Sequence, residues 1–351
     1  MLRGSFSSGR ISASKATAPL QSRLGRIILS RARKQAVRVY KSYVRYFLLL
    51  LLTFSLAAAQ PVPIIFDTDM GNDVDDALAL ALLHSCETRG EAKILAVTIT
   101  KDNRYAAPYV TLFNRFYLRP DIPIGIVKDG VTKDDGHYLR TVLQSFGASS
   151  EGSYPDAVQL LRKTLAAQPD GSVVIVQVGF STNLARLLQT DRELIAKKVR
   201  LLSAMAGNFV ETTPEFNVVK DIPSAQKVFG EWPGDLVSSG YEVGRAIRYP
   251  AKRIDSDFAW TPKSPLVEAY KAYRKMPYDE PLWDPSAALY AVRPDAGYYS
   301  LSPAGKIEVD AKGATRFVPG EGRQHYLIVN EEQKARVLEA ISLLASQPPA
   351  R

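Results

Sequence analysis

The residues with the greatest capacity for chemistry in this sequence are five aspartates within ten consecutive positions, Asp67, Asp69, Asp73, Asp75 and Asp76. Like charges at this spacing repel one another, and a helix N-terminus, worth about half a positive charge, is too weak to offset that repulsion. A bound cation would offset it. Carboxylate ligands without Cys or His indicate a hard ion, Ca²⁺ first and Mg²⁺ second, rather than zinc or copper. The alternative is a solvated acidic loop that caps a helix.

The residues on either side of the aspartates predict a strand, a turn and a helix. Residues 64–66 form a short apolar run, and residues 77–83 repeat apolar side chains as a buried helix does. Asp75 and Asp76 then fall in the first helical turn and project about 100° apart. This geometry leaves one carboxylate free to bind a metal while the other faces a ligand.

The segment DTDMGNDVDDALAL, residues 67–80, resembles the amino-terminal signature of the inosine-uridine nucleoside hydrolase family, a DxDxGxDDAxA pattern. Here two additional residues separate the glycine from the aspartate pair. Either Asp73 or Asp75 therefore fills the first position of the pair, and we favour Asp75 because it directly precedes Asp76. The resemblance extends over residues 61–346 and implies a Rossmann-like single domain.

Beyond residue 61, predicted strands alternate with predicted helices. Strands are predicted at residues 93–100, 122–127, 172–178, 200–206 and 236–239, and a hairpin at 306–317. Helices are predicted at residues 109–117, 155–167, 183–188, 223–231, 265–275 and 284–291, with a last helix capped by Asn330 that runs to Leu344. This alternation is typical of an α/β fold with a largely parallel central sheet flanked by helices, in which ligands bind beyond the carboxyl ends of the strands.

Charge is distributed unevenly along the 351 residues. Residues 1–60 contain eleven of the 45 Lys and Arg residues and none of the 36 Asp and Glu residues, so 34 basic and 36 acidic residues remain in 61–351. The pI near 9.4 is therefore a property of the leader and gives no reason to expect nucleic-acid binding. Cys86 is the only cysteine, which excludes an intrachain disulfide.

Residues 47–59 (FLLLLLTFSLAAA) form an apolar run that follows a basic segment and ends in small residues. This order is typical of a secretory signal with cleavage near Ala59, and the run is shorter than the about 20 residues of a membrane span. We expect residues 1–60 to be an export signal and residues 61–351 to be a catalytic domain. The mature protein is then periplasmic or extracellular, without stable membrane association. The alternatives are a retained membrane anchor, an organellar transit peptide and a misassigned start codon.

The resemblance implies further ligands for a metal and a ribose. Asp284 in LWDP matches the remaining metal-binding aspartate of the family, and the backbone carbonyl that completes the metal shell is here that of Val178. The segment EFN matches the sugar-binding segment, which assigns Glu215 to the 5′-hydroxyl and Asn217 to the 3′-hydroxyl. Asn103 matches an asparagine that lies near the ribose.

Two positions depart from the family pattern. Many members carry a histidine directly before the last metal-binding aspartate, where it protonates the departing base, but Trp283 stands here. Leaving-group activation then requires stacking of the base on Trp283, or an acid such as His137. The loop after Met205 is shorter than usual, and Asn208 is the counterpart of an asparagine that binds the 5′-hydroxyl.

Together with the resemblance, these residues predict a metal-dependent hydrolase that converts ribonucleosides to free base and ribose. Ca²⁺ is expected among Asp69, Asp76, Asp284 and the Val178 carbonyl, with Asp69 as general base and Asp75 on the 2′-hydroxyl. The family also implies a dimer or tetramer. Two alternatives remain, a phosphatase of the haloacid-dehalogenase type, which also opens with a strand and DxD, and an exported nucleoside- or sugar-binding protein without hydrolysis.

Overall fold

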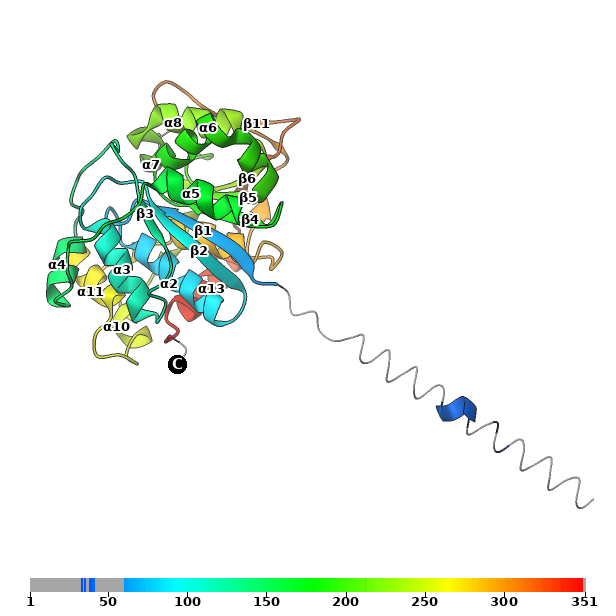
Figure 1. Ribbon diagram of the computed structural model, residues 1–351, viewed down its shortest axis with the longest axis horizontal. Helices are drawn as coiled ribbons and strands as arrows, with labels where there is room; N and C mark the ends of the chain where they lie inside the picture. Colours follow the sequence, from blue (N-terminus) through cyan, green and yellow to red (C-terminus); the bar gives the residue numbers. More distant parts are fainter. Residues whose placement is uncertain (1–32, 34, 36–37, 42–59, 212, 350–351) are drawn as a thin grey trace, which may run out of the picture. The chain divides into compact units, whose positions relative to one another are not determined.

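The computed structural model describes residues 33, 35, 38–41, 60–211 and 213–349 (Figure 1). The chain divides into two units, Met1–Ala59 and Gln60–Arg351, and the predicted site belongs to the second. The apolar run of the predicted export signal, residues 47–59, lies outside the described residues. Within the part that the structure describes, no helix has both the length and the apolar character needed to cross a membrane.

A sheet of ten strands forms the centre of the described part of the second unit (Figure 1). Its parallel strands lie side by side in the order β3 (Ile124–Ile126), β2 (Ala92–Ile99), β1 (Val62–Thr68), β4 (Val173–Gln177), β5 (Val199–Met205), β6 (Asp235–Ser239) and β12 (Gln324–Ile328). The antiparallel strands are the hairpin β10 (Gly305–Val309) and β11 (Thr315–Pro319), and β9 (Ser300–Leu301). The largely parallel sheet predicted from the sequence is therefore confirmed.

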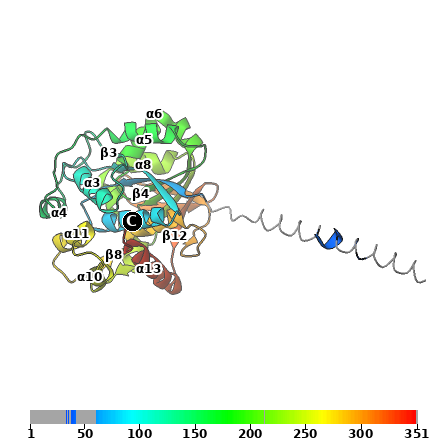
Figure 2. The same cartoon turned by 60° about the horizontal axis from the view of Figure 1, so that its bottom comes forward.

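Helices cover both faces of this sheet (Figures 1 and 2). One face carries α5 (Ala157–Ala166), α6 (Thr182–Lys198) and α8 (Ile222–Glu231), and the other carries α2 (Asp75–Thr88), α12 (Trp283–Val292) and α13 (Glu331–Ala345). In β1, Ile64 and Phe66 belong to one apolar cluster and Ile65 belongs to the other. Because alternate side chains of a strand point to opposite faces, a strand that is covered on both sides requires such a continuous apolar run.

Several short elements are not predicted from the sequence, because their two to seven residues form neither a continuous apolar run nor a regular hydrophobic period. They are α4 (Leu139–Ser145), α7 (Phe216–Lys220), α9 (Tyr241–Ala246), α10 (Arg253–Asp257), β7 (Arg248–Tyr249), β8 (Glu280–Pro281) and the strands β9 and β12. The longer predicted helices are present, including α3 (Ala106–Phe116) and α11 (Pro265–Tyr273). The predicted cap is also present, since Asn330 forms a capping box with Gln333 at the start of α13.

Candidate functional site

A cavity opens beyond the carboxyl ends of β1, β4 and β5, and segments far apart in the sequence line it. Its lining residues are Asp69, Asp73, Asp76, Val178, Met205, Glu215, Phe216, Asn217, Tyr241, Trp283 and Asp284. Seven of the eleven residues predicted for the site are among them. β1 lies between β4 and β2, so the chain proceeds from it toward both edges of the sheet. Such a switch point is where open α/β sheets bind ligands.

Three carboxylates converge beside this cavity. One oxygen from each of Asp75, Asp76 and Asp284 lies within 4.8 Å of the other two, and all three residues are buried. Burial, followed by the charges of neighbouring aspartates, raises the pKa of Asp76 and of Asp284 well above the ordinary value. A divalent cation would stabilise the ionised carboxylates, and oxygens on opposite sides of Ca²⁺ lie about 5 Å apart. This donor set fits a hard metal ion. Asp76 and Asp284 are two of the predicted ligands, but the group contains Asp75 in place of the predicted Asp69, which lines the cavity without belonging to it.

The two helices that supply these carboxylates begin at the site. α2 begins at Asp75 and α12 begins at Trp283, so Asp76 and Asp284 each occupy the second position of a helix. A hydroxyl from the end of β1 adds to the arrangement, because Thr68 donates its Oγ1 hydrogen to Asp76 Oδ1. Each helix N-terminus favours negative charge by the equivalent of about half a positive charge. Two such ends do not balance three carboxylates, which leaves a role for a cation.

The carboxylate of Asp69 is held by a residue of the following turn. Asn72 donates from Nδ2 to Asp69 Oδ2, and Lys101 donates from Nζ to Asn72 Oδ1 at 2.6 Å. Burial raises the pKa of Asp69 to about 7, and the charge of Asp73 acts in the same direction, whereas Asn72 and Lys101 lower it. The sequence pattern does not identify Asn72 or Lys101, because the hydrogen bond between them forms only when β2 pairs with β1.

The end of β4 approaches the backbone of Asp69 closely. A Cβ atom at Gly179 would lie 2.4 Å from the backbone nitrogen of Asp69, so only glycine fits there. The preceding residue, Val178, lines the cavity, and its carbonyl accepts a hydrogen bond from Asn217 Nδ2 at 2.9 Å. A carbonyl oxygen has two lone pairs, so Val178 retains capacity for a second partner such as a metal ion.

The segment EFN forms the start of the short helix α7. Glu215 caps this helix, and its carboxylate accepts from the backbone nitrogens of Asn217 at 2.8 Å and Val218 at 3.2 Å. A third donor, the backbone nitrogen of Gly207, lies at 3.1 Å. Burial raises the pKa of Glu215 to about 7 despite these hydrogen bonds. The local fold thus fixes both polar side chains of EFN at the cavity wall before any ligand binds.

Aromatic side chains form another part of the wall. Trp283 and Tyr241 stack with ring centroids 5.5 Å apart and an interplanar angle of 22°. Trp283 Nε1 donates to the backbone oxygen of Tyr241 at 2.9 Å. Because an indole has only this one N–H, Trp283 cannot also donate a proton to a ligand, and it offers the cavity an aromatic surface.

A sequence model of the inosine-uridine preferring nucleoside hydrolase family matches residues 64–343 of this chain. The chain belongs to this family. The pyrimidine-specific ribonucleoside hydrolase RihA of Salmonella enteritidis is 31% identical over an alignment of 268 residues that covers 67% of this chain and 80% of that protein. The family resemblance derived from the aspartate motif is therefore confirmed.

Solved structures of nucleoside hydrolases share the fold. The plant nucleoside hydrolase PpNRh1 superposes with a TM-score of 0.67 at 21% identity, covering 82% of this chain and 100% of that one. A purine-preferring ribonucleoside hydrolase from Gardnerella vaginalis superposes with a TM-score of 0.64 at 18% identity, covering 81% and 98%. Both confirm the α/β architecture with a mostly parallel sheet.

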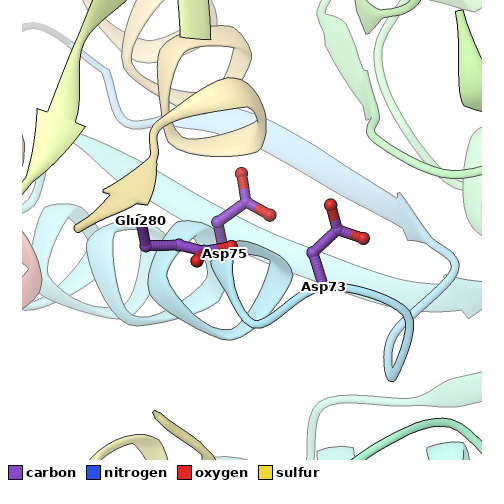
Figure 3. A group of neighbouring side chains, drawn as sticks. All are labelled: Asp73, Asp75 and Glu280. Carbon is purple, nitrogen blue, oxygen red and sulfur yellow. The ribbon is translucent and has the colours of Figure 1, made fainter. Parts of the chain in front are cut away.

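In this chain, the lengthened turn separates the positions of Asp73 and Asp75, the two aspartates between which the sequence left the choice open. Asp73 lines the cavity, whereas Asp75 lies beside it and accepts from the backbone nitrogen of Asp284 at 3.0 Å. Figure 3 shows Asp75 between Asp73 and Glu280, and one oxygen of each lies within 4.8 Å of the others. Burial, together with the charge of Asp73, raises the pKa of Glu280 to about 8. The sequence gives no signal for Glu280, which belongs to the two-residue strand β8.

Three other predicted residues lie outside the cavity lining of the described chain. Asn103 Oδ1 accepts from the backbone nitrogens of Tyr105 at 2.6 Å and Ala106 at 3.1 Å, so this side chain fixes the turn before α3. Asn208 Oδ1 accepts from the backbone nitrogen of Glu211 at 2.9 Å, and the residue borders a different groove. In both cases local backbone groups use the side chain that the family resemblance assigns to the ribose.

The third, His137, is exposed near the cavity rim. Its backbone nitrogen donates to the Gly71 carbonyl at 3.1 Å, and its ring lies edge-on to Tyr273 with centroids 5.7 Å apart. Burial raises the pKa of Asp73, and positive charge at Arg274 and at His137 acts in the opposite direction. His137 is therefore positioned near the cavity without contributing to its wall.

Proposed function

We propose that this protein hydrolyses the N-glycosidic bond of ribonucleosides, with bound Ca²⁺, to give free base and ribose. The observation that carries the proposal is that a single cavity unites a set of oxygen donors for a metal with a set of polar groups for a sugar. The first set is Asp69, Asp76, Asp284 and the Val178 carbonyl, and the second is Glu215 and Asn217.

The role of Asp69 is to accept the proton of the attacking water. When bound, Ca²⁺ would supply positive charge that stabilises the ionised carboxylates and favours deprotonation of water. Asn72 occupies Oδ2 of Asp69, so Oδ1 is the oxygen available for the proton. Burial raises the pKa of Asp69 to about 7 in the ion-free site, and bound Ca²⁺ would lower it, so Asp69 would be ionised at neutral pH and able to accept a proton.

The polar residues of the opposite wall would hold the ribose. Asn217 would bind the 3′-hydroxyl and Glu215 the 5′-hydroxyl, because α7 presents both at the cavity. Asp75 would bind the 2′-hydroxyl, since its carboxylate lies within 4.8 Å of those of Asp76 and Asp284, where the ribose diol must approach the ion. Cleavage develops positive charge on the sugar, and these buried carboxylates stabilise it.

The departing base would stack on Trp283, which stands where many family members carry a histidine. Stacking stabilises the base without protonating it. The cavity lining of the described residues contains no histidine. His137, whose positive charge lowers the pKa of Asp73, is therefore our candidate for the acid that protonates the base. Names of similar proteins include both pyrimidine-specific and purine-preferring hydrolases, so substrates of both kinds belong in the assay.

The test is a panel of purine and pyrimidine ribonucleosides plus an activated aryl riboside, assayed with Ca²⁺ and then with chelator. We expect ribose release that depends on the ion. Cleavage of the aryl riboside alone would show that base activation is what Trp283 has changed, because that leaving group needs no acid. Calorimetric binding of nucleosides without ribose release over hours would instead identify a binding protein and overturn the proposal.

Oligomer formation and export are also proposals. We propose that the mature protein is exported after cleavage near Ala59 and assembles as a dimer or tetramer. Amino-terminal sequencing of the mature protein tests the first statement, and light scattering tests the second. An intact amino terminus, or a monomer at micromolar concentration, would contradict them.

A further inference from the structure

Lys101 is a buried lysine at a position where burial is costly. It lies two residues after the end of β2, and none of its surface is accessible to solvent. Lysine is almost never fully buried unless its ammonium group is paired, because removing the charge from water costs several kcal/mol. The acceptor of its 2.6 Å hydrogen bond is not a carboxylate but the amide oxygen of Asn72. The charges of Asp134, Asp69 and Asp76 stabilise the buried ammonium at longer range, but they do not explain its direct hydrogen bond to Asn72.

The bonding capacity of Lys101 determines the orientation of Asn72. An ammonium group has only donors, so the Asn72 oxygen must face Lys101, and the Asn72 NH₂ group then faces Asp69 Oδ2. The reverse orientation of the amide would bring its oxygen against the carboxylate. The ammonium also polarises the Asn72 amide, which strengthens the hydrogen bond that Asn72 donates to Asp69. Lys101 thus acts on the orientation of the Asp69 carboxylate through Asn72, and its charge also lowers the pKa of Asp69 directly.

The turn that carries Asn72 is fixed from its other side. A Cβ atom at Gly71, which has φ +115°, would lie 2.5 Å from the side chain of Leu139, and the Gly71 carbonyl accepts from the His137 backbone nitrogen at 3.1 Å. This is also the turn that is two residues longer than the family pattern. The position of Asn72 is therefore set by the fold, and its amide orientation is what Lys101 adds.

We propose that Lys101 is a positioning residue that fixes the Asn72 amide and thereby aims the carboxylate of Asp69 for proton removal. This inference rests on the proposed hydrolysis, in which Asp69 is the general base. Lys101 lies outside the cavity lining of the described residues, and neither Glu215 nor Asn217 bonds to it. Its loss should therefore lower kcat and leave KM nearly unchanged.

The first experiment compares Lys101→Met, Asn72→Ala and the double variant on the aryl riboside. Losing one charge-assisted hydrogen bond should lower kcat on the order of 10- to 100-fold, with KM changed less than about threefold. Because Lys101 orients Asp69 through Asn72, the double variant should lose much less activity than the product of the two single losses. Lys133→Met is the matched control, since this nearby lysine has a side chain that is 76% exposed. Wild-type kcat in Lys101→Met, or additive losses in the double variant, would overturn the proposal.

The second experiment separates positioning from a purely structural role. Ethylammonium added to Lys101→Ala should restore part of kcat, whereas the same concentration of sodium chloride should not, and Asn72→Ala should not respond to the amine. A crystal structure of Lys101→Met provides a readout that is independent of activity, and we expect the Asn72 amide to have left Asp69 Oδ2. An unchanged Asn72–Asp69 contact would refute the role of Lys101. Absence of ribose release by the wild-type protein would instead refute the proposed function.

Discussion

Glu280 provides a prediction in which the size of a stability change depends on pH. This residue is fully buried, and among the described residues neither of its carboxylate oxygens has a hydrogen-bond partner. Burial and the charge of Asp73 raise its pKa from 4.5 to about 8. A raised pKa in the folded state means that Glu280 favours folding most below the unfolded pKa, and that this contribution is lost as the pH rises through about 8.

The size of the effect follows from the pKa difference. One unit corresponds to about 1.4 kcal/mol, so ionising Glu280 at pH 8 reduces the free energy of unfolding by about 4 kcal/mol relative to the protonated side chain. Glutamine has nearly the same shape as protonated glutamate and cannot ionise. Glu280→Gln should therefore lie within about 1 kcal/mol of the wild type at pH 5 and be more stable by up to about 4 kcal/mol at pH 8.

Urea unfolding at pH 5, 6, 7 and 8 in the presence of a chelator measures these differences, provided that the transitions are two-state. Glu321→Gln is the control, because that glutamate lies on an exposed turn and should show no such pH dependence. A Glu280→Gln variant that is less stable than the wild type at pH 8 would refute the reasoning. That result would mean that Glu280 is ionised and paired with a cation.

Three further predictions concern the site. Asp284→Asn should bind Ca²⁺ at least tenfold more weakly, as measured by calorimetry, and release no ribose while its circular dichroism stays unchanged; wild-type affinity would exclude Asp284 as a ligand. Gly244→Ala should reduce kcat/KM at least tenfold, because the added Cβ would lie 2.5 Å from the Cα of Trp283 and displace the start of α12; full activity would show that the helix tolerates the change. Burial raises the pKa of Asp69 and of Glu215 to about 7, so the melting temperature of the ion-free protein should fall from pH 5 to pH 8. Added Ca²⁺ should raise the melting temperature more at pH 8 than at pH 5. An equal rise at both pH values would contradict this.

The fold was largely predictable because its main elements carry strong local patterns. The apolar run of β1 and the alternation of strands and helices predict a parallel sheet, and the Asn330 cap predicts the start of α13. β12 is different, because it pairs with β6 across a long stretch of sequence and its five residues have no distinctive period. Pairing between distant segments depends on the assembled fold and not on the residues of one segment.

The site was predictable where the residues form a motif and not where they meet through tertiary contacts. Asp69, Asp76 and Asp284 belong to recognisable segments, and the structure brings all three to one cavity. Lys101 and Glu280 stand alone in the sequence, and their importance follows only from complete burial beside the aspartates. Neither role can be predicted from the sequence, because each depends on which side chains the fold brings next to Lys101 and Glu280.

The central claim is that aspartates from distant parts of the chain bind one divalent ion, to which a ribose then binds. A crystal structure of Asp69→Asn with Ca²⁺ and a ribonucleoside tests it most directly, because loss of the general base should preserve the uncleaved substrate. We expect the ion beside Asp76, Asp284 and the Val178 carbonyl, with the ribose hydroxyls against it and Asn217 on the sugar. A nucleoside bound away from these carboxylates, or no ion among them at millimolar Ca²⁺, would contradict the account.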